Sequence, residues 1–94
     1  MNFEWNESKQ QKNVLKPGID FADAREVFDD PAAYTLLSPR VAGELRYVTV
    51  GLMRKQLIAF VFTHRGDAVR IISARVARRN ERKLYDSESA NKKP

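Results

Sequence analysis

The segment 57–62 constrains the fold more than any other part of this 94-residue sequence, because six consecutive residues there are apolar (LIAFVF). A continuous apolar run of this length is typical of a central strand that is covered on both faces. The preceding segment, 44–51, follows a period of two residues, and the segments 53–55 and 65–67 have the composition of turns. The sequence therefore predicts an antiparallel meander with 57–62 at its centre.

The N-terminal residues predict a short strand followed by a helix. Residues 1–5 alternate apolar and polar side chains, which is typical of an edge strand. Asn6 is a good N-cap residue and the Pro-Gly pair at 17–18 ends a helix, so we expect a helix between them. One polar stripe on this helix, which either faces solvent or borders a cleft, is spaced i, i+4, i+7 and consists of Lys9, Asn13 and Lys16.

A second helix and a short strand are predicted before the meander. Asp20 is an N-cap candidate, and the segment 21–28 places apolar residues on one helical face. The Asp-Asp-Pro sequence at 29–31 ends this helix. Residues 34–37 are then predicted to form a short strand, and 38–43 a loop.

The last part of the chain predicts a strand that leads directly into a basic helix. Residues 68–75 alternate β-branched side chains with Arg70, and 76–85 reads as a cationic amphipathic helix. On a helical wheel the packing residues lie opposite a basic arc of roughly 140°, with Glu81 and Tyr85 at its border. The basic arc consists of Arg75, Arg78, Arg79, Arg82 and Lys83.

These elements together predict an α+β fold: two N-terminal helices, an antiparallel sheet of about four strands, and a C-terminal basic helix. At 94 residues there is room for one core. We expect a single domain over 1–86, followed by a flexible polar tail over 87–94.

The charge of the chain is concentrated in the strand-helix unit. The sequence holds 17 Lys and Arg against 12 Asp and Glu, a net charge of +5. Between residues 65 and 83 there are seven basic and two acidic residues, so this segment alone accounts for 7 − 2 = +5. All but one of the seven are Arg, whose planar fork suits phosphate. A nucleic acid is therefore the expected partner, although a charged helix face that only meets solvent is the plainer alternative.

Composition also excludes several classes of site. There is no Cys, and His64 is the only His, so neither a disulfide, thiolate chemistry nor a zinc site of usual composition can be built. No apolar run approaches the ~18 residues of a membrane span, and the N-terminus lacks a signal-peptide pattern. We expect a cytoplasmic protein that uses no cofactor, no metal and no membrane.

The order and spacing of many residues resemble the BrnT family of bacterial type II toxins, which are ribonucleases with a RelE-like fold. The resemblance extends from about Met1 to Tyr85, and its most specific part is the closing run 70–75 with the residues after it. The matching residues are Phe3, Glu4, Trp5, Lys9, Asn13, Lys16, Gly18, Phe21, Ala24, Val27, Phe28, Asp30, Pro31, Gly43, Glu44, Arg46, Gly51, 70–75, Ala77, Arg79, Glu81, Arg82 and Tyr85.

The resemblance implies a metal-independent endoribonuclease, in which a ribose 2′-hydroxyl attacks its own adjacent phosphate. Such catalysis rests on positioning and on charge stabilisation by arginines. Arg70, Arg75 and Arg79 would hold phosphate, either Glu81 or His64 would be the base, and Tyr85 would be the acid. The other residues expected to bind RNA are Lys9, Lys16, Arg46, Arg65, Arg78, Arg82 and Lys83. Glu81 is also expected to pair with Arg78 on the helix surface, and His64 to be an ordinary surface residue.

The sequence departs from the family pattern at Asn6, Pro17 and His64, where the family commonly has Asp, His and Glu. The alternative is therefore a non-catalytic RNA- or partner-binding module on the same fold. The resemblance also implies a cognate BrnA-like antitoxin with a DNA-binding domain, in a hetero-oligomer with at least two toxins. We expect this partner to mask the basic helix, since its uncompensated charge would otherwise bind RNA indiscriminately.

Overall fold

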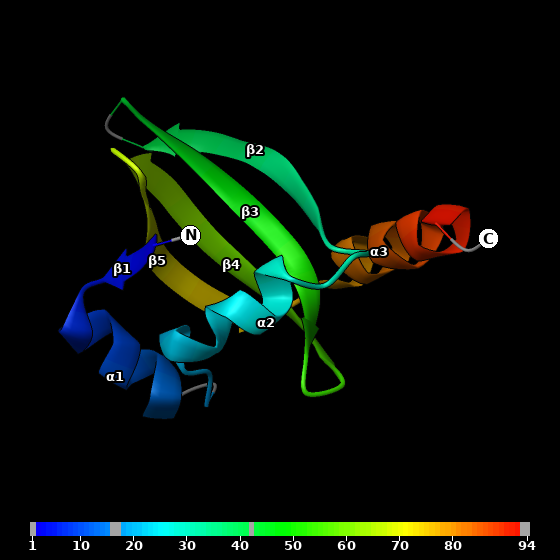
Figure 1. The fold of residues 1–94 in the computed structure, drawn as a ribbon, viewed down its shortest axis with the longest axis horizontal. Helices are drawn as coiled ribbons and strands as arrows, with labels where there is room; N and C mark the ends of the chain where they lie inside the picture. The colour runs from blue at the N-terminus through cyan, green and yellow to red at the C-terminus, as the bar shows by residue number, and fades with distance from the viewer. Residues whose placement is uncertain (1, 16–17, 42, 93–94) are drawn as a thin grey trace.

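The computed structural model of the protein describes residues 2–15, 18–41 and 43–92 (Figure 1). Within these residues it is an α+β fold built on one five-stranded mixed sheet, with the strand order β1-β5-β4-β3-β2. The strands are β1 (Asn2–Trp5), β2 (Tyr34–Val41), β3 (Glu44–Met53), β4 (Gln56–Arg65) and β5 (Ala68–Val76). None of the helices in the described ranges is both long and apolar enough to cross a membrane.

The central strand β4 is covered on both faces, as its apolar run predicts. Ile58 and Phe60 are fully buried in one core cluster, whereas Leu57 and Ala59 belong to a second cluster. Successive side chains of a strand point to opposite faces, so the two clusters lie on opposite sides of the sheet. The chain therefore needs cover on each side of β4.

The first face is covered by the N-terminal helices, α1 (Glu7–Leu15) and α2 (Ala24–Phe28), with the 3₁₀ turn η1 (Phe21–Asp23) between them (Figure 1). Both predicted caps are confirmed: the Asn6 side chain accepts the Lys9 N–H at 3.2 Å and Asp20 accepts the Ala22 N–H at 2.9 Å. The predicted second helix instead begins as a 3₁₀ turn, because the Asp23 N–H donates to the Asp20 carbonyl three residues back. Lys16 and Pro17 lie outside the described residues.

The sequence predicts an antiparallel sheet of about four strands, whereas the sheet has five strands and β1 pairs with β5 in parallel. Phe3 lies opposite Val69 and Trp5 opposite Ile71. The alternation of residues 2–5 indicates a strand, and it is indeed at the sheet edge. Alternation does not set direction, however, and only strands joined by a tight hairpin must be antiparallel. Strands β1 and β5 are far apart in the chain, so their relative direction could not be predicted.

Three strands are longer than predicted. β2 runs to Val41 rather than to residue 37, so residues 38–41 are not the expected loop. Its pairing with β3 shifts register between Ser38 and Val41, and Pro39 is tolerated because β2 is an edge strand with this irregularity. β3 and β4 extend to a two-residue turn in which Arg54 and Lys55 have φ values of 50° and 69°, the geometry that matches strand twist in hairpins.

The C-terminal helix α3 (Arg79–Lys92) begins later than the sequence predicts. Val76 still belongs to β5, opposite Ile58, and the Ala77 N–H donates to the Leu57 carbonyl at 2.9 Å. The sheet therefore continues through the first residues of the predicted helix. The backbone also stays helical through residues 87–92, where a frayed tail is expected, because neither Gly nor Pro interrupts the chain before residue 94. The domain boundary at residue 86 stays a prediction.

The strand β3 passes close to α2 at Gly51. A Cβ atom at this position would lie 2.8 Å from the Val27 carbonyl oxygen and 3.1 Å from the Ala33 Cβ. We expect Gly51→Ala to lower the free energy of unfolding by about 1–3 kcal/mol through overpacking, measured by urea denaturation. Gln56→Ala, at an exposed position on the next strand, should change it by less than about 0.5 kcal/mol. Equal stability of the two variants would contradict this close packing.

Candidate functional site

Three arginines point from the sheet away from α1 and α2, and we call this side the arginine face. On β5, Arg75 lies opposite Ala59 of β4 and Arg70 lies opposite Thr63. Ala59, Val61 and Thr63 are on the same side of β4, because every second side chain of a strand points the same way. Arg46 is on the same side of β3 as Val48 and Val50, which pack with the second core cluster. The arginine face is thus defined by Arg46, Arg70 and Arg75.

Each of these arginines is held by a glutamate. Arg46 Nε donates to Glu44 Oε2 at 3.0 Å, and Arg70 Nη1 donates to Glu4 Oε2 at 2.8 Å. Arg75 donates from Nη1 and Nη2 to the two oxygens of Glu81, at 2.6 and 3.0 Å. The arginine side chains are 25–29% exposed, so all three reach solvent from fixed positions.

The pair of Arg75 and Glu81 is the strongest electrostatic feature of this face. The hydrogen bond from Arg75 lowers the pKa of Glu81, with a further contribution from the Arg78 backbone N–H, which donates to Glu81 Oε1 at 2.7 Å. The same pair raises the pKa of Arg75. Tyr34 also contacts Glu81, because the Tyr34 hydroxyl donates to the Glu81 backbone carbonyl. Glu81 thus binds the side chain of Arg75, rather than that of Arg78 as the sequence suggests.

The pairing leaves hydrogen-bonding capacity on each arginine. A guanidinium has five N–H donors, and the bidentate contact of Arg75 with Glu81 uses two of them. Arg46 and Arg70 each use one for their glutamate. The remaining donors suit the oxygens of a phosphate, which arginine binds through parallel N–H bonds.

The middle of the arginine face is open and apolar. The register places Leu36, Val48, Val61 and Ser73 in one row across four strands. Leu36 is 52% exposed, and the other three are half-buried. This row lies between Arg75 at one end of the sheet and Arg70 towards the other. The face therefore has Arg75 towards one end and Arg46 and Arg70 towards the other, with a mainly apolar strip between them.

Tyr85 lies inside the protein, not at the border of a basic helix face. It is 7% exposed and its hydroxyl donates to Asp30 Oδ2 at 2.7 Å. Burial, followed by the hydrogen bond to Asp30, raises the pKa of Tyr85 to about 12. The same carboxylate oxygen accepts the Leu52 N–H at 2.9 Å. This geometry fits a residue that fastens α3 to the sheet, because the hydroxyl is buried and bound to Asp30 rather than open to a ligand.

The exposed cations of α3 point elsewhere. Glu81 and Tyr85 mark the side of the helix that packs on the sheet, and at about 100° per residue Arg79 and Lys83 lie on the opposite side, with Arg82 between. All three are exposed. The predicted helical wheel was wrong because it included Arg75. Arg75 belongs to β5, so Arg75 does not share a helix face with Arg79. Arg78, in the link before α3, and Arg65, at the end of β4, are also exposed.

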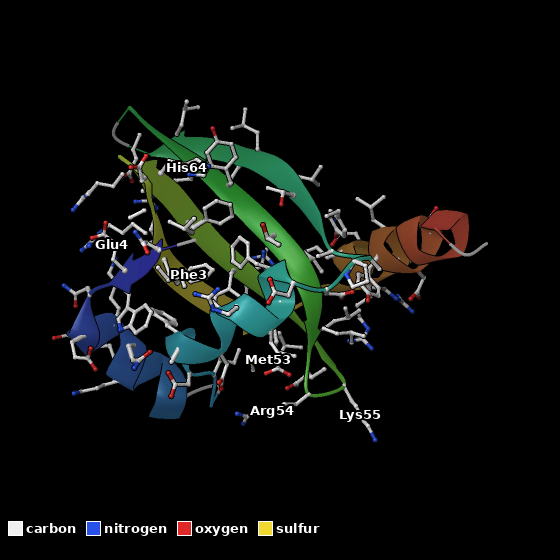
Figure 2. The ribbon with its side chains drawn as sticks, viewed as in Figure 1. Phe3, Glu4, Met53, Arg54, Lys55 and His64 are labelled. Atoms are coloured by element: carbon white, nitrogen blue, oxygen red, sulfur yellow. The ribbon has the colours of Figure 1, made fainter. Side chains whose placement is uncertain are left out.

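His64 and Lys9 are not brought to the arginine face. His64 follows Thr63 in β4 and contacts the rings of Tyr47 and Phe62, on the side that carries α2. Figure 2 shows it near one end of the sheet, far from the hairpin of Met53, Arg54 and Lys55 at the other end. Lys9 is exposed on α1, and Lys16 lies outside the described residues. No three His, Asp or Glu side chains in the described ranges gather as metal ligands.

Sequence reasoning missed the partners of the arginines. Glu4 and Glu44 belong to motifs that matched the family. The period of two residues over 44–51 places Glu44 and Arg46 on one face of a strand, but nothing in a linear pattern indicates that Glu4 binds Arg70. Glu4 is 66 residues from Arg70, and only the parallel pairing of β1 with β5 brings the two opposite each other. Asp30 was read as a helix end, whereas it also binds Tyr85 of α3.

One family model matches the sequence over residues 5–81, and its description is "Ribonuclease toxin, BrnT, of type II toxin-antitoxin system". The match covers more than half of the chain and includes Arg46, Arg70, Arg75 and Glu81, but it ends before Tyr85. No curated protein matches the sequence.

The raised pKa of Tyr85 gives the stability an alkaline dependence. An unfolded tyrosine ionises near pH 10, while folded Tyr85 stays neutral to about pH 12. Its contribution is therefore complete below pH 10 and is lost between pH 10 and 12. The difference in unfolding free energy between wild type and Tyr85→Phe should shrink over this range, measured by urea denaturation at each pH. Tyr47→Phe, which keeps Tyr85 and its hydrogen bond to Asp30, is the control and should retain the wild-type loss, and a constant difference for Tyr85→Phe would exclude the assignment.

Proposed function

The chain belongs to the BrnT family of ribonuclease toxins from type II toxin-antitoxin systems, and we propose that it cleaves RNA on the arginine face. The observation that supports this site most directly is the set of three arginines, each fixed by a glutamate and each partly exposed. Fixed cations favour catalysis because they stabilise developing charge without having to reorganise.

The proposed reaction is an internal transesterification. The ribose 2′-oxygen attacks the adjacent phosphorus, the bond from phosphorus to the 5′-oxygen breaks, and the products end in a 2′,3′-cyclic phosphate and a 5′-hydroxyl. The nucleophile belongs to the substrate, so the protein has to align the RNA and stabilise charge on the phosphoryl oxygens. Arg75 is the best placed for this task, because Glu81 holds its guanidinium plane and uses only two of its five N–H donors.

The spacing of the arginines suits a polynucleotide better than a single phosphate. Arg70 and Arg75 lie on one strand, and at a rise of about 3.3 Å per residue their Cα atoms are roughly 15 Å apart. An extended RNA strand would lay several phosphates along this length. The apolar strip of Leu36, Val48 and Val61 between them would then face ribose and base surfaces.

A non-catalytic RNA-binding module on the same fold is the second candidate, and a specific observation favours it. Two of the three expected proton carriers are not open to a ligand on the arginine face: Tyr85 is buried and bound to Asp30, and His64 lies on the other side of the sheet. Binding would need only the arginines. A measurement of RNA cleavage therefore distinguishes the ribonuclease from the non-catalytic RNA-binding module.

Purified protein incubated with cellular RNA in the presence of EDTA should yield fragments with 2′,3′-cyclic phosphate and 5′-hydroxyl ends. The reason is that the proposed chemistry rests on arginines alone. End mapping by sequencing and by phosphatase sensitivity would measure this. Binding without cleavage would select the second candidate, and activity that needs Mg²⁺ would exclude the proposed mechanism.

Matched variants locate the site in the same assay. Arg75→Lys keeps the charge but loses the fork, so cleavage should fall by about 10²-fold or more while circular dichroism stays unchanged. Arg70→Gln should lower the slope of log affinity against log salt by about one unit. Lys12→Gln removes an exposed cation from α1, on the other side of the sheet, and serves as the control.

Membership of the family implies an antitoxin partner. We propose that this partner is a BrnA-like protein with a DNA-binding domain, that it covers the exposed cations of α3, and that its own dimer brings together at least two toxins. Arg79, Arg82 and Lys83 form a cationic surface that would attract an acidic segment and speed its encounter.

Co-expression with the product of the neighbouring gene should give a complex that co-elutes in size-exclusion chromatography and restores growth. Reversing the charge of Arg79, Arg82 and Lys83 together to Glu should weaken association, and the loss should be greatest at low salt. Reversal of Lys9 and Lys12 on α1 is the control. If the control weakens the complex as much, the partner does not bind α3 through charge.

A further inference from the structure

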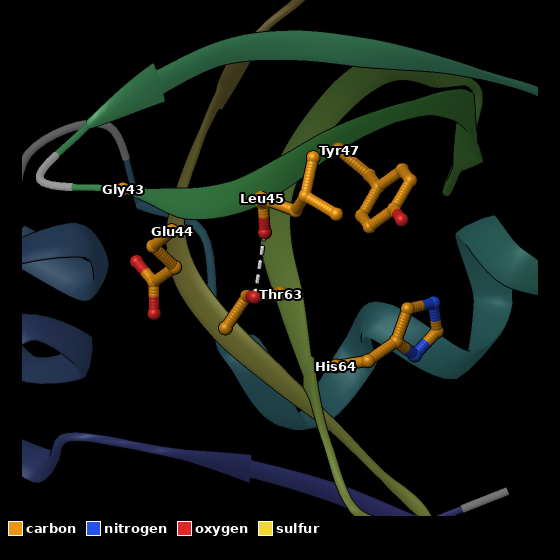
Figure 3. Close-up of a pocket in the computed structure, with 6 residues that line it drawn as sticks. All are labelled: Gly43, Glu44, Leu45, Tyr47, Thr63 and His64. Carbon is orange, nitrogen blue, oxygen red and sulfur yellow. Dashed lines mark hydrogen bonds between the residues drawn. The ribbon is translucent and has the colours of Figure 1, made fainter.

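The strands β3 and β4 separate at one end and leave a notch between them. Their pairing ends at Tyr47 and Phe62, yet β3 begins at Glu44 and β4 continues to Arg65. The Thr63 hydroxyl donates to the Leu45 carbonyl at 2.7 Å across this opening. The β3–β4 notch has a volume of about 330 Å³ and is lined by Gly43, Glu44, Leu45, Tyr47, Thr63 and His64 (Figure 3).

One wall of the notch is aromatic. The rings of Tyr47 and Phe62 are stacked, with centroids 5.5 Å apart at 25°, and His64 meets Tyr47 edge-on at 5.2 Å. Phe62 is buried and backs the other two rings, while His64 is exposed. Figure 3 shows the rings of Tyr47 and His64 on one side of Leu45 and Thr63, and the Glu44 carboxylate on the other.

The notch also adjoins the arginine face. Glu44 is the residue that holds Arg46, and Thr63 lies opposite Arg70 in the strand register. A phosphate bound by Arg46 or Arg70 would therefore lie beside the opening. Glu44 Oε2 accepts from Arg46, and the carboxylate keeps further capacity to accept hydrogen bonds.

We propose that the β3–β4 notch binds one nucleobase of the RNA, flanking the phosphates held on the arginine face; this rests on the proposed function. An aromatic wall with an exposed edge is the surface on which unstacked bases of single-stranded RNA stack. The volume is at the low end for ligand pockets, which suits a single base. The Glu44 carboxylate lies on the opposite side of Leu45 and Thr63 from the aromatic wall, so we expect the notch to hold the base by stacking and not to select one pyrimidine.

Exposed apolar side chains lie in and beside the notch: Leu45, which lines it, is 38% exposed, and Leu37, opposite Tyr47 in the strand register, is 64% exposed. An apolar segment of a partner protein would also fit such a surface. The polar lining of Glu44, Thr63 and His64 and the adjoining arginines favour the nucleobase. The experiment must therefore also be able to detect binding of a partner-protein segment in the notch.

The test uses 2′-O-methyl oligonucleotides, which cannot be cleaved by 2′-attack, with cytosine, uracil or no base on the same backbone. Fluorescence anisotropy should show that the full-length protein binds the cytosine and uracil oligomers more tightly than the abasic oligomer. His64→Ala should weaken cytosine binding by about ten-fold with an unchanged salt slope, because it removes stacking surface and no phosphate contact. His64→Phe, which keeps a ring, should restore most of the affinity.

The outcomes separate this inference from the proposed function. Two results would overturn the proposed base-binding role of the notch: equal binding of cytosine and abasic oligomers by the wild type, or an unchanged affinity of His64→Ala. Neither result would contradict cleavage on the arginine face. A His64→Ala protein that keeps RNA affinity but loses antitoxin affinity also overturns the base-binding role, because the notch is then a protein-binding surface. If no oligomer binds and no RNA is cleaved, the proposed function fails as well. Crosslinking of 4-thiouridine RNA to residues 44–47 or 62–64 would support the notch directly.

Discussion

The burial of β4 on both sides is the constraint on which the rest of the structure depends. Its alternate side chains feed two core clusters, so each face of the sheet must receive apolar cover. The N-terminal helices supply that cover on one face. On the other face, Ala77 and Tyr85 cover only the end of the sheet near Leu57 and Ala59. The uneven cover leaves the opposite part of this face in contact with solvent, and Arg46 and Arg70 lie there.

The ion pairs on this face fix the positions of the arginine side chains more than they stabilise the fold. Partly exposed ion pairs contribute little to folding, typically under about 1 kcal/mol each, so their value lies in fixing the guanidinium groups. The glutamates also change the picture given by net charge. The excess of +5 over residues 65–83 already counts Glu81, which pairs with Arg75, and it is reduced further by Glu4, which lies outside this segment and pairs with Arg70. The unpaired excess sits instead on α3, which suits a different partner.

The sequence predicts what depends on local pattern, and it fails where distant parts of the chain meet. The apolar run of β4, the caps at Asn6 and Asp20 and the two hairpin turns are local, and the structure has them all. The arginine face was only partly predictable: the arginines follow from the charge, but Arg70 and Arg75 take their glutamates from β1 and α3. The start of α3 was missed by three residues because sheet pairing extends through Val76. The predicted helical wheel therefore included residues that precede the helix.

A single carboxylate, that of Asp30, links the core to the arginine face. Its Oδ1 accepts the Ala32 N–H, and its Oδ2 accepts both the Leu52 N–H and the Tyr85 hydroxyl, so it joins the start of β2, the strand β3 and the helix α3. Tyr85 is one helical turn beyond Glu81, and fixing Tyr85 therefore fixes the height and rotation of Glu81 above Arg75. The orientation of that arginine thus depends on a hydrogen bond that never touches it. In a domain this small, the residues that hold the last helix in place are also the residues that set the geometry of the candidate site.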